Sequence, residues 1–513
     1  MHSDNKRLAK NTGLLYFRLL FLTLVNLYAV RVTLEALGDT DFGLYNVIAS
    51  VVTALSVLTG AMTSATQRFL SFHLGRKDYD KYSHLFTLML MCFIGLAIVL
   101  MIIGESLGYF AIFHWLTIPP DRLSASYWVF QASLFSFAVG FITIPYSSSI
   151  VANERMNAFA VFSIVEGVMK LAIAFVIIKY TGDRLILYGV LTALISVVVF
   201  IMTVHYCHSR FKFCRYIWKW DGSIFREVSK YTGWNLFGSI SGILATQGQN
   251  ILLNIFFGPL INTSKAIADR IKLVVNGFSI NLYMAASPQI IKAYAANDHI
   301  RAINLVLKTS KLSFLLIFIL SFPLICCIDS ILQLWLGDES LTPDMASFSQ
   351  IMLVYCMVLS LEPPLTRLIQ ATGNIRNYEL AVGCITLSYI PLTAVTLCFF
   401  KNALLVLVMI IAIMAIVQIV RVMIVHRQVS LDYNRYFKEV LFPIAKVSIV
   451  GIATFICFKE YFNSNGLLLS LLQLITTTIA GIFIAAVLGL DNNERKMIFD
   501  FLKNKIKAHV DDI

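Results

Sequence analysis

The sequence predicts an all-α integral membrane protein with about 14 transmembrane helices, and three observations support this fold class. First, 58% of the 513 residues are hydrophobic and only 14% are charged, whereas soluble domains carry about a quarter charged residues. Second, apolar runs such as residues 85–104 and 403–420 reach the length of about 20 residues that a helix needs to cross a bilayer. Third, these runs are continuous and do not alternate at period two, which excludes a membrane β-barrel.

The expected helices follow one another with mostly short connections. The first, residues 12–36, is too long and too interrupted by Arg18 and Arg31 to be a cleavable signal peptide. After it, Gly38 is suited to end one helix in a left-handed cap, and Gly43 lets the next begin closely. The other predicted segments are 42–67, 85–113, 125–150, 156–179, 185–207, 232–257, 263–291, 309–336, 346–371, 378–400, 402–426, 440–462 and 467–489.

The net charge of +12 follows the expected topology. With the N-terminus in the cytoplasm, most basic residues outside the helices fall on the cytoplasmic side, including those of the long aromatic and basic connection 209–233. We expect this connection to lie at the membrane surface and both termini to be cytoplasmic. The charge therefore gives no reason to expect nucleic-acid binding. The basic residues of the outer loops are Arg122, Lys179, Arg184, Lys401 and Lys459.

Two pairs of segments resemble each other at a nearly constant offset. One pair places Gln67 on Gln289, a shift of 222, and the other places Ala152 on Ala371, a shift of 219. Because the two shifts agree and the segments share their place in the helix order, we infer an internal repeat of six helices, which is typical of transporters. The pairs are 63–82 with 285–304 and 144–162 with 362–382.

This repeat predicts two six-helix lobes and a C-terminal addition. We expect an N-terminal lobe over 1–220, a C-terminal lobe over 221–430, and two further helices with a cytoplasmic tail over 431–513. An even number of helices in each half makes the repeat parallel, with its axis along the membrane normal. A substrate site is then expected between the lobes.

Enzyme chemistry finds little support in the sequence. Most of the nine cysteines lie in apolar runs, and none forms a CxxC pair or a metal-ligand spacing, so we interpret them as packing residues. The sequence contains no P-loop and no HExxH motif, so neither an ATP-driven pump nor a metalloenzyme is indicated, and we expect no cofactor. A membrane-embedded polysaccharide polymerase or glycosyltransferase is the less favoured alternative, because it would need a sizeable outer loop with catalytic groups and the outer loops here are short.

Charged residues inside the predicted helices are the candidate functional residues. A Lys or Arg at a helix centre costs about 2.5–3.5 kcal/mol on insertion scales, so these side chains should face protein or water. Near the cytoplasmic ends we expect Arg367, Arg421 and Lys446 to snorkel to the headgroups. Arg31 forms either a helix-end pair with Glu35 or part of a binding site. The candidates for substrate binding are Arg18, Arg31, Lys170, Lys265, Arg270 and Lys272, and those for proton or sodium coupling are Glu166, Asp269 and Glu362.

Residues 262–289 carry a line of polar side chains at helical spacing. We expect this face and a polar line on the second helix to border a shared aqueous cleft. The alternative is that the helix begins only at Leu273, which would leave the charges in the outer interface. The first face consists of Lys265, Asp269, Lys272, Asn276, Ser279 and Tyr283, and the second of Asn46, Ser50, Thr53, Gly60, Ser64 and Gln67.

The stretches AVRVTLEALG (29–38), LGDTDFGLYNVIASVV (37–52) and GAMTSATQRFLSFHLGRKD (60–78) carry a family resemblance. They resemble the Wzx-type O-antigen and polysaccharide flippases, a lipopolysaccharide-biosynthesis branch of the multidrug/oligosaccharidyl-lipid/polysaccharide exporter superfamily. That superfamily also holds drug exporters and the lipid II flippase. The resemblance covers essentially the whole chain in helix count, repeat and tail.

The resemblance implies a V-shaped pair of helix bundles that alternates access in a bacterial inner membrane. The implied function is to move an undecaprenyl-pyrophosphate-linked oligosaccharide, an O-antigen or capsule repeat unit, from the cytoplasmic to the periplasmic leaflet. Its implied partners are polysaccharide polymerase and glycosyltransferases. The alternative is a cation-coupled multidrug exporter of the same superfamily, which would favour an acidic cleft, whereas the cationic candidates here suit a pyrophosphate.

Overall fold

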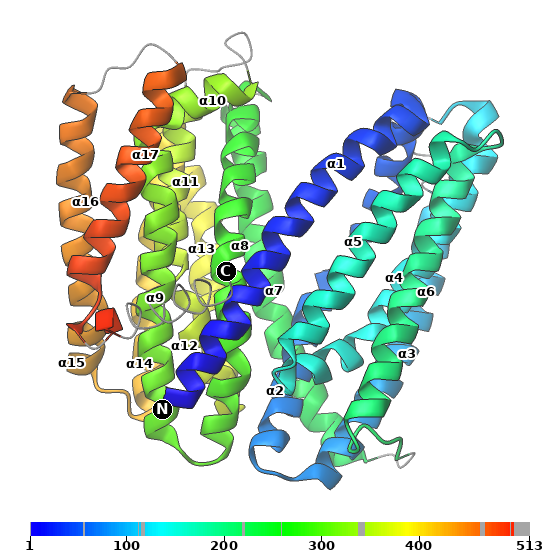
Figure 1. Ribbon diagram of the computed structural model, residues 1–513, viewed down its shortest axis with the longest axis horizontal. Helices are drawn as coiled ribbons and strands as arrows, with labels where there is room; N and C mark the ends of the chain where they lie inside the picture. The colour runs from blue at the N-terminus through cyan, green and yellow to red at the C-terminus, as the bar shows by residue number, and fades with distance from the viewer. Residues whose placement is uncertain are drawn as a thin grey trace, which may run out of the picture. The chain divides into compact units, whose positions relative to one another are not determined.

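The computed structural model describes residues 2–54, 57–110, 112–113, 118–217, 221–257, 259–336, 344–461, 467–492 and 494–496. In these ranges the chain is helical apart from short connections (Figure 1). Among the described residues, ten helical spans are long and apolar enough to cross a membrane. Large apolar side chains such as Phe399 and Ile449 are exposed along them, as expected of surfaces that lipid covers. The all-helical membrane fold is confirmed, whereas the count of fourteen spanning helices stays a prediction.

The chain divides into two compact units. The first unit comprises Met1–Ile240, Met284–Ala302 and Gln370–Leu380. In it α4 packs against α2, α3 and α6, and α1 lies along α5 (Figure 1). Its helices are α1 (His2–Ala54), α2 (Val57–Gly75), α3 (Tyr79–Phe110), α4 (Leu123–Ala152), α5 (Met156–Ile178), α6 (Arg184–Arg210) and the start of α7 (Gly222–Phe257).

The second unit comprises Ser241–Tyr283, Ile303–Ile369 and Ala381–Ile513. Phe348 and Leu253 lie in its buried core, where the Tyr389 hydroxyl donates to the Val406 carbonyl over 2.9 Å. Its further helices are α8 (Pro259–Ala295), α9 (His299–Cys326), α10 (Ile328–Leu336), α11 (Met345–Leu359), α12 (Glu362–Thr372), α13 (Arg376–Phe400), α14 (Ala403–Val429), α15 (Tyr433–Tyr436), α16 (Phe442–Tyr461) and α17 (Leu467–Ile484).

One predicted helix break is confirmed and one predicted helix needs correction. The predicted segments 12–36 and 42–67 meet within α1, which consists of two helices joined at a kink. The kink falls at Gly38, where φ 77 and ψ 167 give a backbone conformation that suits glycine alone. The predicted helix 346–371 is divided into α11 and α12, since Pro363 and Pro364 in the first turn of α12 lack the N–H groups that would continue α11.

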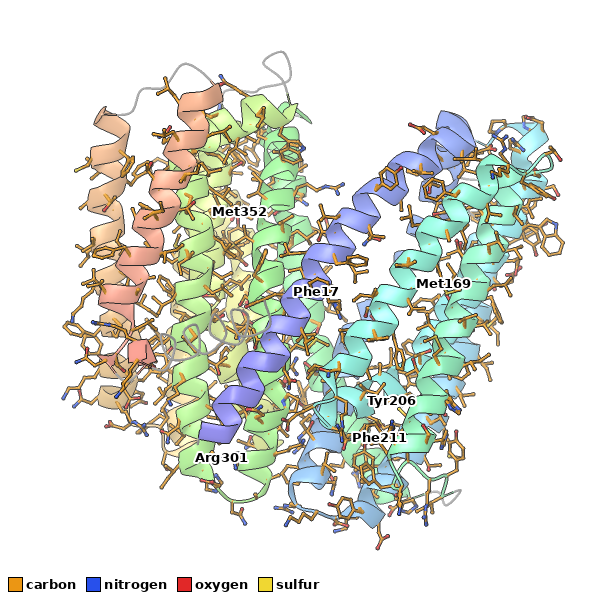
Figure 2. The ribbon with its side chains drawn as sticks, in the orientation of Figure 1. Phe17, Met169, Tyr206, Phe211, Arg301 and Met352 are labelled. Carbon is orange, nitrogen blue, oxygen red and sulfur yellow. The ribbon has the colours of Figure 1, made fainter. Side chains whose placement is uncertain are left out.

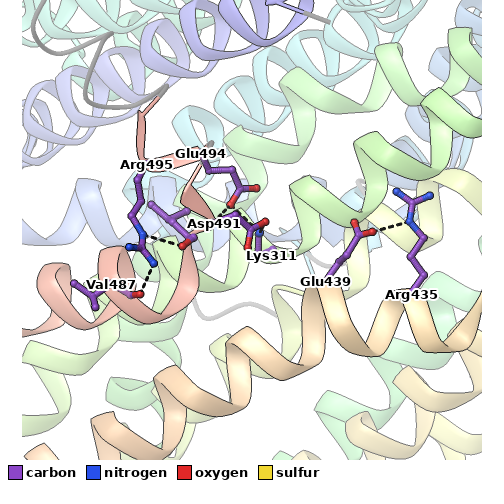
Figure 3. Close-up of polar contacts among 8 residues, drawn as sticks. Lys311, Arg435, Glu439, Val487, Asp491, Glu494 and Arg495 are labelled. Carbon is purple, nitrogen blue, oxygen red and sulfur yellow. Dashed lines mark hydrogen bonds and ion pairs between the residues drawn. The ribbon is translucent and has the colours of Figure 1, made fainter.

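Two connections are held by specific polar contacts. After α6 the chain folds back onto α3, where the Ser83 hydroxyl donates to the Phe213 carbonyl over 2.6 Å. Figure 2 shows Tyr206 and Phe211 next to this connection. Beyond α17, buried Lys311 of α9 pairs with Asp491 at 3.1 Å and Glu494 at 2.7 Å (Figure 3). This second contact fastens the described end of the chain to the second unit.

Four helix-to-helix corners share one backbone geometry, and they recur at the offset of the predicted repeat. Lys77 (φ 58) and Asn297 (φ 60) follow α2 and α8 and lie 220 positions apart. Glu154 (φ 58) and Gly373 (φ 79) follow α4 and α12 and lie 219 positions apart. Each ends its helix in a left-handed residue that directs the backbone N–H groups to carbonyls of the last turn. The recurrence supports the internal repeat, while the lobe boundaries stay predictions.

Candidate functional site

The charged stretch that begins α8 forms a compact ion cluster. Lys265 Nζ lies 2.6 Å from Asp269 Oδ2, and Lys272 Nζ lies 2.8 Å from Asp269 Oδ1. The spacings of four and three residues place all three side chains on one face of the helix. Because α8 begins at Pro259, the alternative that the helix starts only at Leu273 is wrong. The charges belong to the helix.

A pocket of about 470 Å³ in the second unit opens beside this cluster. Asn250 of α7 and exposed Arg270 of α8 contribute polar groups to its wall, together with Lys265 and Asp269. Ala266 and Leu273 supply apolar surface. The guanidinium, ammonium and amide donors give the pocket the chemistry of a site for an anionic group attached to an apolar body.

The positive charge at this site exceeds the negative charge. Lys265, Arg270 and Lys272 stand against the single carboxylate of Asp269. Lys272 also lies over the ring of Tyr355, 5.7 Å from its centroid, which adds a cation–π contact from α11. An anion in the pocket would therefore meet cations that Asp269 only partly neutralises.

One residue of the predicted polar face of α8 is covered by a neighbouring helix. Ser279 is buried and shares a 2.8 Å hydrogen bond with Ser313 of α9, so the prediction that it faces water is wrong. Ser279 lies on the predicted face of α8, but α9 covers that face at this position. Of the matching line on the second helix, the side chains of Asn46, Ser50 and Thr53 lie outside the part that the structure describes.

In the first unit, three predicted site residues gather between α1 and α5. Glu166 Oε1 accepts from Lys170 Nζ, four residues further along α5, over 2.6 Å. Arg18 Nη1 donates to Ser163 Oγ over 3.4 Å, and its guanidinium lies over the ring of Phe159. The side chain of Arg31 lies outside the described part of the chain.

The first unit also holds a pocket of about 240 Å³ with hydroxyl groups in its wall. Tyr45, Ser133, Ser136 and Thr192 provide the hydroxyls, and Phe137 provides an aromatic face. Hydroxyls that both donate and accept suit a neutral polar ligand, and the ring suits the apolar face of a sugar.

Buried Arg421 and half-buried Glu362 form an ion pair in the second unit. Arg421 Nη2 lies 2.9 Å from Glu362 Oε1, and Arg421 Nη1 donates to Gln418 Oε1 over 3.2 Å. The prediction that Arg421 snorkels is wrong, because its side chain is buried where α12 supplies a carboxylate. This pair links Glu362, a coupling candidate on α12, to α14.

Some charged residues at helix ends were not predicted as candidates. Arg68 is buried, and its Nε donates to the Gln370 carbonyl over 3.0 Å. Glu154 is buried too and accepts from Lys292 Nζ over 2.8 Å. In the sequence, Arg68 and Lys292 are not distinguished from the other basic residues on the cytoplasmic side. The alignment of Gln67 with Gln289 pointed to the same two helix ends.

Metal binding has no candidate in the described residues. No group of three or more His, Cys, Asp or Glu side chains there is placed to hold a metal ion.

Comparison with known proteins places the fold. Residues 239–395 match the family model MatE. Solved structures agree over most of the chain: a MATE transporter in complex with MaD3S has a TM-score of 0.70 at 12% identity, covering 83% of this chain and 97% of its own. No curated protein sequence matches the chain.

Two further structures have the same fold. One is an outward-facing multidrug resistance MATE family transporter of the MOP superfamily, with a TM-score of 0.71 at 11% identity over 83% of this chain and 96% of its own. The other is a MOP superfamily transporter from Pyrococcus furiosus, described by a binding pocket of reverse polarity. Its TM-score is 0.69 at 12% identity, covering 83% of this chain and 96% of its own. These structures are transporters, so their fold agrees with the predicted transporter class. The comparisons do not extend to the Wzx-type branch.

Proposed function

We propose that this chain exports anionic amphiphiles across a membrane, and that the pocket beside Lys265 and Arg270 receives the anionic group. The single observation that carries this proposal is the surplus of positive charge around Asp269. Arg270 is the residue best placed to bind this group, because it is exposed and lies in the pocket wall. Its planar guanidinium can also donate two hydrogen bonds to a pair of phosphate oxygens.

The finer proposal is an undecaprenyl-pyrophosphate-linked oligosaccharide moved to the periplasmic leaflet of a bacterial inner membrane. The pyrophosphate suits the cationic pocket of α8, and the hydroxyl-lined pocket at Tyr45 suits a sugar. Moving about two negative charges outward across 100 mV, inside negative, releases about 4.6 kcal/mol, so the membrane potential favours this direction. Arg18 and Lys170 are proposed to meet the same substrate at another stage of its passage.

Ion coupling is proposed at the paired carboxylates. Asp269 and Glu166 each balance lysines on their own helices, so protonation or sodium binding there would free a cation for the substrate. Glu362 is the weaker candidate because its carboxylate is paired with the buried guanidinium of Arg421.

A second candidate is an ion-coupled exporter of cationic drugs. It is supported by the MatE match and by the multidrug resistance transporter among the similar structures, which agree with this class better than with a glycan flippase. The charge of the α8 pocket opposes it. The Pyrococcus protein, for which a binding pocket of reverse polarity suggests a different function, is a precedent for such a departure.

Arg270→Ala tests the proposal in a strain that lacks its own copy of the gene. We expect loss of surface polysaccharide with normal protein level, whereas Arg270→Lys should retain part of the activity because the charge remains. The matched control is Arg210→Ala, which removes an exposed arginine at the end of α6. Surface glycan is measured by gel and lectin staining, and membrane protein by blot.

The same strains distinguish the two candidates. Resistance to cationic drugs that depends on the chain, with surface glycan unaffected by its loss, would favour the drug exporter. Full surface glycan in a well-expressed Arg270→Ala strain would refute the role given to the α8 pocket.

A further inference from the structure

Two later segments of the chain belong to the first compact unit. They are 284–302, which contains the end of α8, and 370–380, which contains the end of α12 and the start of α13. Both continue into helices of the second unit. Their attachment to the first unit therefore depends on the contacts that they make with α2, α4 and α7.

The first attachment is made by Arg68 near the end of α2. Its Nε donates to the Gln370 carbonyl over 3.0 Å, and its guanidinium lies over the rings of Phe69 and Tyr231. One helical turn earlier, Ser64 Oγ donates to Gln370 Oε1 over 3.2 Å. The guanidinium also fills the space in which a side chain on Gly373 would lie. Arg68 thus holds the corner that follows α12.

The second attachment is made by Glu154 at the corner that follows α4. Its carboxylate accepts from Lys292 Nζ over 2.8 Å and from Gln289 Nε2 over 3.3 Å, both from the end of α8. Nearby, Ala285 packs against Val151 in a buried cluster. Glu154 thus holds the end of α8.

The two attachments are related by the internal repeat. The end of α2 holds the corner after α12, and the end of α8 holds the corner after α4. Gln67, next to Arg68, aligns with Gln289, and Glu154 lies 219 positions before Gly373. Each half of the sequence therefore reaches into the equivalent corner of the other half.

The residues between these polar contacts are small. Gly75 packs so closely that a Cβ would lie 2.7 Å from the Lys292 Cα atom. Ala285, Ala286 and Ala293 are buried on the end of α8. Small side chains permit close approach but bury little apolar area, so the attachment relies on its polar contacts more than a large apolar interface would.

Glu154 occupies a backbone conformation that costs free energy. Its φ of 58 is left-handed, and the equivalent corner uses Gly373, for which this conformation carries no steric cost. A glutamate there is strained unless its side chain compensates. The observed compensation is the contact with Lys292 and Gln289, which ties the strain to the attachment of α8.

We propose that Arg68 and Glu154 form a two-part latch that holds segments 284–302 and 370–380 on the first unit in one state of the transport cycle and releases both together in another. The inference rests on the proposed transport function for its cycle but on no particular substrate. Joint release follows because α2 and the α8 end contact each other through Gly75 and Lys292, so loss of one attachment loosens the other.

Hydrogen–deuterium exchange of the purified full-length protein in lipid nanodiscs tests the latch without any substrate. In Glu154→Gln we expect exchange of peptides from both 284–302 and 370–380 to accelerate by about tenfold or more, because a buried pair has lost one charge. Glu154→Lys combined with Lys292→Glu should restore protection in both. The control is Glu227→Gln, which removes the exposed carboxylate 3.9 Å from Arg68 and should change little.

A purely structural role predicts different results. Glu154→Gly relieves the left-handed strain, so a corner that serves packing alone would gain protection, whereas the latch predicts faster exchange in both segments. A single peak on size exclusion, and protection outside both segments that equals that of the unsubstituted protein, show that each variant is folded. Faster exchange confined to 284–302, or no change in either segment, would overturn the latch. Failure of the glycan assay leaves this result unaffected, so the two proposals fail separately.

Discussion

Two ion clusters inside helices, one in each unit, start from the same sequence pattern and end in different surroundings. Glu166 and Lys170 of α5 lie four residues apart, as do Lys265 and Asp269 of α8, and both pairs are 2.6 Å apart. The α5 side chains are 40% and 43% exposed, whereas Lys265 is 2% and Asp269 28% exposed. The four-residue spacing brings the two side chains together, and the neighbouring helices determine how much stability is lost when the pair is broken.

The reason for the difference lies beside each pair. Ser264 and Ala268 flank Lys265 and are fully buried, so the other helices of the second unit approach α8 closely there. Val168, between the α5 partners, is exposed. An exposed pair contributes about 0–1 kcal/mol, whereas a buried charge that loses its partner costs about 3–5 kcal/mol. Three substitutions test this comparison.

The largest effect is expected from Asp269→Ala. It leaves Lys265 buried and Lys272 half-buried without their shared carboxylate, which we expect to destabilise the protein by about 3–5 kcal/mol. The measurement is the melting temperature of the purified protein, followed by tryptophan fluorescence, together with its yield in membranes. A melting temperature equal to that of the unsubstituted protein would show that water reaches Lys265 and that its burial has been misjudged.

A smaller effect is expected from Lys265→Met. The side chain keeps its length without its charge, and Asp269 retains Lys272 at 2.8 Å, so no charge is left alone. Replacing a buried charge with an apolar side chain of similar volume is often neutral, and we expect a change below about 1 kcal/mol. Substrate transport should nevertheless fall, because the pocket loses a cation. A stability loss as large as that of Asp269→Ala would mean that Lys265 itself, and not its neutralisation, stabilises α8.

The smallest effect on stability is expected from Glu166→Gln. The pair is half-exposed and its partners have side-chain freedom, so we expect a loss under about 1 kcal/mol. The melting temperature is compared at low and high salt, since salt screens an exposed pair but affects a buried one much less. A drop similar to that of Asp269→Ala would place the α5 pair in surroundings as dry as those of α8 and remove the contrast.

Local features of the chain were accessible from its sequence. The apolar runs predicted the helices, since a backbone in lipid must satisfy its hydrogen bonds within the segment. The pairs Glu166–Lys170 and Lys265–Asp269 follow from the spacing in the sequence, because helical geometry alone places residues four apart side by side. The break at Gly38 and the offset of the repeat are local patterns of the same kind, and the structure has the kink at that residue.

The tertiary structure alone decided which charges are buried and which partner each one meets. Glu154 pairs with a lysine 138 positions away, and Arg68 donates to a carbonyl 302 positions away, distances at which no spacing rule applies. Arg421 was expected at the headgroups and is instead buried beside Glu362, because α12 packs where the sequence indicates only a helix end. Helical periodicity determines which face a side chain occupies, but packing between distant helices determines whether that face meets lipid, water or another charge.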